Sequence, residues 1–167
     1  MGAVSGVDPD AYRRAVGRFA TGVTVVTTVA GGTDQAMTAN AFTSVSLEPV
    51  LVLVCLDKDA RVHDAVLASG TWGVSVLTEG ARPAAQWFAS VGRPVHGQLA
   101  RVPHHRGPAT GVALLDDALA TLEVATRAVH DGGDHSIVVG EVLAVATPVA
   151  EAGPLLWHRG RYRGLAR

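Results

Sequence analysis

The sequence predicts a mainly β fold, an antiparallel barrel of six or seven strands with a few flanking helices. Most strand-like segments follow one another along the chain, and the regular alternation of strands and helices that builds a parallel sheet is missing. The length of 167 residues is enough for one domain with a sizeable core and too short for two. We therefore expect a single domain over residues 1–167.

The first half of the chain has the pattern of one helix followed by a strand meander. An aspartate and a proline at positions 8 and 9 are typical of a helix start, and apolar residues follow at helical spacing. A β-branched run that ends at two glycines is typical of a strand and its turn. These patterns predict a helix over residues 9–20 and strands over residues 23–29, 36–46 and 50–56.

The second half mixes helices and strands around one irregular segment. Residues 90–111 contain glycines, prolines and two adjacent histidines without any period, which indicates a long loop of the kind that is often functional. The other patterns predict helices over residues 60–68 and 81–89, strands over residues 72–77, 122–127 and 137–145, a turn at residues 132–133 and a final hairpin about residues 159–160.

Composition and charge argue against several classes of partner. The formal net charge is -1 and the basic residues are scattered, so we expect neither a nucleic acid nor a membrane surface as partner. No run approaches the ~20 apolar residues of a membrane helix, and the N-terminus lacks the layout of a secretion signal, so we expect a cytoplasmic protein. Because 48% of the residues are apolar and only 17% are charged, we expect some apolar surface to be buried between the subunits of a homodimer.

Motifs of several common catalytic classes are missing. The chain has neither the glycine-rich dinucleotide fingerprint nor the glycine-lysine phosphate loop, and it has no glycine-flanked serine elbow. Cys55 is the single cysteine and lies in an apolar run, where cysteine usually serves as a small hydrophobe. No two histidines stand three or four residues apart on a predicted helix, so we expect no metal site.

One segment has a composition suited to a flat ligand. Residues 37–46 place hydroxyl and amide side chains among small residues. Small side chains let a ring approach the backbone, while the hydroxyls and amide offer hydrogen bonds to its edge. The alternative is ordinary β surface, for which a strand rich in threonine and serine is also typical.

Six blocks of sequence, in the same order and over nearly the whole chain, resemble the flavin reductase family. They span residues 21–27, 38–49, 53–57, 69–77, 133–142 and 154–157. The resemblance implies a split barrel with a Greek-key core, a homodimer, and FMN or FAD bound near the subunit interface.

The same resemblance implies the residues that contact the flavin. Its expected contacts with the isoalloxazine ring and the ribityl chain are Thr38, Ala39, Asn40, Ser44, Val45 and Ser46, with largely backbone contacts from Cys55, Leu56 and Asp57. Lys58 or Arg61 is expected to supply positive charge for the flavin phosphate. Ala60 stands where the family commonly has a serine, so this part of the site departs from the family pattern.

His135 is the residue that the resemblance places beside the nicotinamide. A lone histidine next to a glycine turn is usually a surface or structural residue, and the block Gly133-Asp134-His135-Ser136 favours the functional interpretation. The implied reaction transfers a hydride from NADH or NADPH to the flavin and releases reduced flavin to a partner monooxygenase. Such a transfer needs no protein nucleophile, which agrees with the missing catalytic triad.

Two other functions compete with this one. The first is a flavin-binding or electron-transfer module without turnover, against which His135 argues. The second is a single-component flavin oxidase similar to the pyridoxamine phosphate oxidases, against which the blocks around Asn40 and His135 argue.

Overall fold

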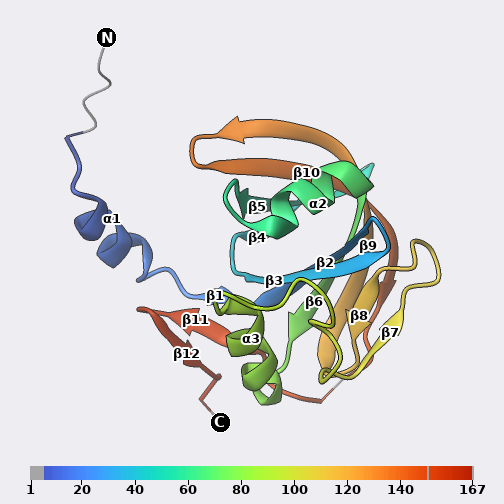
Figure 1. Ribbon diagram of the computed structural model, residues 1–167. Coiled ribbons are helices and arrows are strands. Elements are labelled where there is room, and N and C mark those ends of the chain that lie inside the picture. The colour runs from blue at the N-terminus through green and yellow to red at the C-terminus, as the bar shows by residue number, and fades with distance from the viewer. Residues whose placement is uncertain (1–5, 150, 167) are drawn as a thin grey trace.

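A curved antiparallel sheet of seven strands forms the body of the protein (Figure 1). The computed structural model describes residues 6–149 and 151–166. In spatial order the strands are β3 (Thr33–Ala39), β2 (Thr24–Ala30), β6 (Thr71–Leu77), β9 (Ala118–Gly132), β10 (His135–Ala146), β5 (Val50–Asp57) and β4 (Phe42–Leu47). In the described part of the chain no ladder joins β3 to β4. The mainly β, antiparallel prediction is therefore confirmed, and the sheet does not close into a barrel.

Helices and two small sheets surround this body (Figure 1). The helices are α1 (Pro9–Val16), α2 (Arg61–Ser69), the short 3-10 turn η1 (Glu79–Ala81) and α3 (Arg82–Ala89). The small sheets are β1 (Thr21–Gly22) with β11 (Leu156–His158) and β12 (Arg161–Arg163), and β7 (His104–Arg106) with β8 (Ala113–Leu115). α2 packs against β2 and α3 against β3. None of the described helices is long and apolar enough to cross a membrane.

The predicted strand over residues 36–46 is wrong, because the chain breaks at Asn40 and Ala41 into β3 and β4. These two strands lie at opposite edges of the sheet. The Thr24 hydroxyl donates to the carbonyl of Ala39 (2.7 Å), and the Cys55 amide donates to the carbonyl of Ala41 (2.9 Å). The break is thus fixed by partners on β2 and β5, and no glycine or proline marks it locally.

The first helix is shorter than predicted, ending at Val16 instead of residue 20. None of its residues is buried, and α1 stands away from the body at the end of an extended segment (Figure 1).

The predicted loop over residues 90–111 is also partly wrong, because β7 lies inside it and pairs with β8. A three-residue strand leaves too few residues for a period to appear in the sequence.

All three predicted glycine turns are confirmed, the first at Gly31 and Gly32 between β2 and β3. Gly133 has φ 83° between β9 and β10, and Gly160 has φ 73° between β11 and β12. Both angles lie in the left-handed region, which glycine adopts without steric strain because it has no Cβ. The β9–β10 turn carries His135 at the first position of β10, so its conformation decides where that histidine lies.

The core consists of two clusters, to which consecutive residues of β2 contribute in turn, Val25 to one and Val26 to the other. One gathers about Trp72, Leu56 and Val66, and the other about Phe88 and Leu77. All of these side chains are fully buried. Since α2 belongs to the first cluster and α3 to the second, the cores hold the two helices at fixed positions with a cleft between them.

Candidate functional site

A cleft of about 410 Å³ lies between the start of α2 and the end of α3. Its lining comes from β3 (Gln35, Met37, Thr38), the β5–α2 turn (Asp57, Asp59, Ala60), the start of α2 (Arg61, Val62) and the end of α3 with the residues after it (Phe88, Ala89, Ser90, Val91, Gly92, Arg93). Of the expected flavin residues, the cleft brings together Thr38, Asp57 and Arg61.

A larger cavity of about 720 Å³ lies on the other side of α3. Its lining is mostly apolar, with Pro83, Trp87 and Leu115 among its residues. None of the expected site residues lines it. The smaller cleft is therefore the candidate site, because three of the expected flavin residues and two arginines line it.

Two arginines meet in the smaller cleft. Arg61 Nη2 donates to the carbonyl of Arg93 (2.6 Å), and Arg93 Nη2 donates to the carbonyl of Ala36 (2.9 Å). The other terminal nitrogen of Arg93 donates to the carbonyl of Ser90, while its buried Nε has no partner in the described structure. Among the described residues, neither guanidinium forms an ion pair with a carboxylate.

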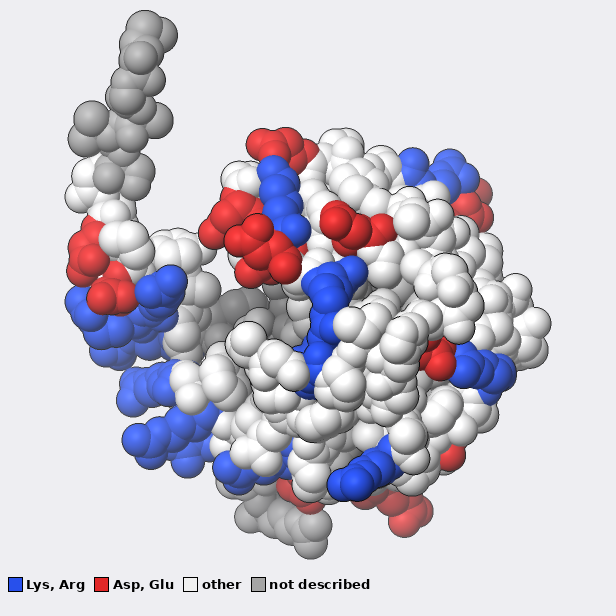
Figure 2. Space-filling view, in the orientation of Figure 1, with Lys and Arg blue, Asp and Glu red and all other residues white. Residues whose placement is uncertain are grey.

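The two arginines of this cleft offer charged donors to an anionic ligand. Burial, and then repulsion from Arg61, lower the pKa of Arg93, but a guanidinium is still charged near neutral pH. Ala60 at the start of α2 offers no side-chain cap, so the first amides of the helix add to the positive end. Two carboxylates also line the cleft; Asp57 Oδ1 is engaged by the Asp59 amide at 2.8 Å. Figure 2 shows Lys and Arg atoms in the middle of this face, with acidic atoms close to them.

The end of β3 places Thr38 and Asn40 differently. Thr38 lines the cleft, and its hydroxyl donates to the carbonyl of Ala85 (2.7 Å), which ties β3 to α3. Asn40 is exposed in the bend and donates from Nδ2 to the Thr21 hydroxyl (3.2 Å). Ala39 is buried between them. The Thr38 hydroxyl is therefore near the end of β3 and the Asn40 amide in the bend after it.

β4 and β5 carry the other expected flavin residues outside the cleft lining. The β4–β5 ladder has a bulge between Ser44 and Ser46, and the extra residue Val45 is 47% exposed. The Ser46 hydroxyl accepts from the Glu48 amide (3.2 Å). Cys55 is half-buried, and the Leu56 side chain is fully buried in the core. Leu56 can therefore face a ligand only with its backbone.

Lys58 lies outside the cleft lining, with its ammonium on the β9–β10 turn. Its Nζ donates to Asp131 Oδ1 (2.5 Å) and to the carbonyl of Gly133 (2.6 Å). The hydrogen bond from Lys58, and then its charge, lower the pKa of Asp131 below its usual range. Of the two basic residues expected at the flavin phosphate, Lys58 is thus engaged at the β9–β10 turn, and Arg61 lines the cleft.

His135 lies on β10, the strand next to β5, and the last residue of β5 lines the cleft. His135 pairs across the β10–β5 ladder with this residue, Asp57. Its Nδ1 is 2.7 Å from Asp134 Oδ1, and 41% of its side chain is exposed. The hydrogen bond from His135, and then its charge, lower the pKa of Asp134. The ring is therefore accessible, and its position depends on the β9–β10 turn.

Arg93 is one of the cleft residues for which the sequence predicted no role. It follows α3 within residues 90–111, for which no role was predicted. The available signal was a lone arginine between Gly92 and Pro94 in a segment without periodicity. Such a pattern does not say which neighbour the side chain meets, so only the folded chain reveals the pair with Arg61.

Comparison with known proteins identifies the family. The family model described as the flavin reductase like domain matches residues 16–166. The NADH-dependent FAD reductase of Streptomyces globisporus is 45% identical over 155 residues, which cover 92% of this chain and 84% of that protein. The reductase subunit HsaB of a flavin-dependent monooxygenase from Mycobacterium tuberculosis is 35% identical over 160 residues, covering 95% of this chain and 83% of that one.

Solved structures give the same result. The NADH:FAD oxidoreductase SgcE6 of Streptomyces globisporus, in complex with NAD and FAD fragments, has a TM-score of 0.90 at 40% identity and covers 99% of this chain and 98% of its own. BorF, the flavin reductase component of a bacterial two-component tryptophan halogenase, has a TM-score of 0.90 at 42% identity, covering 96% and 99%. This chain, with its cleft beside α2 and its β9–β10 turn carrying His135, belongs to the flavin reductase family.

Proposed function

We propose that this protein is an NADH-dependent flavin reductase that reduces FAD or FMN and supplies free reduced flavin to a partner monooxygenase. The observation that carries the proposal is the cleft itself, which holds two arginines without carboxylate partners among the described residues and is also lined by Asp57, the residue that pairs with His135 across the β10–β5 ladder. Relatives named as NADH-dependent FAD and FMN reductases and as a monooxygenase reductase subunit support it. The nicotinamide donor also supports a cytoplasmic location.

The residues present fit a flavin nucleotide. Arg61 and Arg93, which line the cleft without a carboxylate partner among the described residues, would hold its phosphate. Thr38 and Asn40 would bind the edge of the ring and the ribityl chain, together with Ala39, the bulged segment Ser44, Val45 and Ser46, and the backbone of Cys55, Leu56 and Asp57. Bound flavin supplies an acceptor for the hydride of the nicotinamide, so the protein needs only to hold the two nucleotides together.

Flavin-dependent oxidation of NADH tests the proposal. The purified protein, given each of FAD and FMN with each of NADH and NADPH, should oxidise NADH steadily only when flavin is added. A bound flavin that accepts no electrons from NADH would instead support the electron-transfer module. Oxidation of an organic substrate without a partner enzyme would support the single-component oxidase.

His135→Ala should raise KM for NADH and lower kcat/KM for NADH by about 5- to 30-fold, because the exposed ring would contribute one positioning contact worth ~1–2 kcal/mol. Binding of oxidised flavin should change little, since the ring lies outside the cleft lining. Stopped-flow reduction of flavin at increasing NADH concentrations measures the reduction rate and its saturation with NADH. A wild-type rate and saturation curve in the folded variant would give His135 a structural role only.

The protein should be a homodimer. On α1 and the segment after it, Tyr12 is 59% exposed, Val16 48% and Phe19 75%, and Leu47 at the end of β4 is 89% exposed. No residue of α1 is buried, and these four exposed apolar side chains suit burial against a second copy. Light scattering at micromolar concentration should give the mass of two chains. A monomer with full activity would contradict the expectation.

A further inference from the structure

The β9–β10 turn, which carries His135, projects beyond its neighbours in the sheet (Figure 1). The ladder between β10 and β5 begins at the pair His135 and Asp57, so the turn residues before His135 have no strand partner on that side. The turn contains Gly132 and Gly133, the second with φ 83°. Glycines give a turn little stiffness of its own, so its position depends on what holds it from outside.

Lys58 holds the turn from the exposed side. Its ammonium bonds the Asp131 carboxylate at 2.5 Å and the Gly133 carbonyl at 2.6 Å, and its backbone amide donates to the carbonyl of Asp134 (3.0 Å). Lys58 is the only lysine of the chain. Lys58 thus forms hydrogen bonds with Asp131, Gly133 and Asp134, which are three of the four residues directly before His135.

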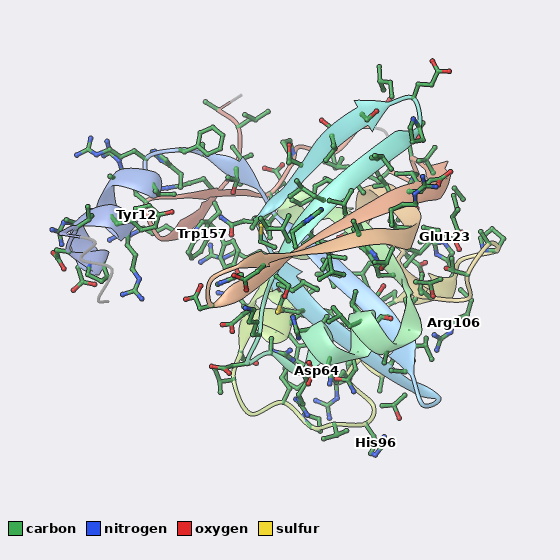
Figure 3. All side chains as sticks on the ribbon, turned by 90° about the horizontal axis from the view of Figure 1, so that it is seen from above. Tyr12, Asp64, His96, Arg106, Glu123 and Trp157 are labelled. Carbon is green, nitrogen blue, oxygen red and sulfur yellow. The ribbon has the colours of Figure 1, made fainter. Side chains whose placement is uncertain are left out.

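His63 holds the same hairpin from the buried side. It lies on α2 with 8% of its surface exposed, and its Nε2 is 2.9 Å from the hydroxyl of Ser136, the residue after His135. Its Nδ1 is 2.8 Å from Asp64 Oδ1, which orients the ring. Asp64 lies on α2 in Figure 3. Although aspartate, histidine and serine here have the order of a hydrolytic triad, Ser136 is only 6% exposed, so a substrate cannot reach it and a positioning role fits better.

We propose that Lys58 and His63 are positioning residues for His135, a two-point clamp that fixes the β9–β10 turn over the nicotinamide site. This inference rests on the proposed function, because it assigns the clamp an effect on nicotinamide use. An exposed ion pair contributes little to global stability, so Lys58 acts mainly on the geometry of the turn. Arg61 lies between the two clamp residues, and the segment 58–63 therefore joins the flavin cleft to the turn.

Kinetics of three single variants test the clamp. Lys58→Met, Asp131→Asn and His63→Gln should each raise KM for NADH by about 3- to 10-fold, since each loosens a positioning contact, while KM for flavin stays within about twofold. Asp131 is 82% exposed, so its variant should fold even if a buried substitution does not. Lys58→Arg, which keeps the cation, should restore most of the wild-type KM. Arg127→Met is the matched control, because it removes another ion pair of the same hairpin (Arg127 to Glu141, 2.7 Å) and should leave KM for NADH unchanged.

A double-mutant cycle shows whether the clamp works through His135. In the His135→Ala background, Lys58→Met should cause no further rise in KM for NADH, because the positioned ring is already gone. An equal rise in both backgrounds, or wild-type KM values in all three single variants, would overturn the clamp. If His135→Ala itself leaves KM for NADH unchanged, the clamp fails as well, while flavin-dependent NADH oxidation by the wild-type protein still supports the proposed function.

Discussion

Glu123→Ala should lower the free energy of unfolding by about 3 kcal/mol, since it leaves buried donors without their charged acceptor. Glu123 is 1% exposed in β9, and its Oε2 accepts from the amides of Ala109 (3.0 Å) and Thr110 (2.6 Å) and from the Thr110 hydroxyl (2.7 Å). A Cβ on Gly107 would lie 2.4 Å from the same carboxylate, so the loop packs directly on it. Figure 3 shows Glu123 and Arg106 at the same end of the molecule.

Urea denaturation of the variant and of a matched control measures this effect. Glu141→Ala removes a glutamate from the neighbouring strand whose ion pair with Arg127 is partly exposed, with 36% and 57% of the two side chains accessible. The control should lose less than about 1 kcal/mol, because solvent screens such a pair. Equal losses in the two variants would show that Glu123 does not anchor the loop over residues 107–111.

Arg93→Met should weaken FMN binding by about 10- to 100-fold and leave riboflavin binding nearly unchanged, because a charge-assisted hydrogen bond to phosphate contributes ~1.5–3 kcal/mol and riboflavin has no phosphate. The guanidinium lies in the cleft beside Arg61 and has a buried Nε without a partner in the described structure. Fluorescence titration of oxidised FMN and riboflavin measures the two affinities.

Arg101→Met provides the control for this comparison. Arg101 lines the larger cavity on the far side of α3, so its loss should change neither affinity. Equal weakening of FMN and riboflavin by Arg93→Met would mean that Arg93 supports the shape of the cleft and does not bind phosphate.

Much of the secondary structure could be predicted from local patterns. Strand β5, helices α2 and α3, and the glycine turns at Gly133 and Gly160 lie where periodicity and turn chemistry indicate. Each of these features depends on residues close together in the chain: apolar spacing, β-branched runs, and glycines that accept positive φ. The short-range blocks of the sequence also carry the family resemblance, and they include Thr38 and Asp57 of the cleft.

Long-range partners decided the remaining features. The break at Asn40 and Ala41 follows from separate ladders to β2 and β5, and no local residue marks it. Lys58 bonds Asp131, 73 residues later in the chain, and Arg61 bonds Arg93, 32 residues later. A charged side chain bonds an opposite charge or a carbonyl that the fold brings close to it. The separation of two residues along the sequence does not give their distance in the folded chain. The sequence therefore predicted that either basic residue could lie near the flavin phosphate. Only the tertiary structure shows that Arg61 lines the cleft and that Lys58 bonds the turn before His135.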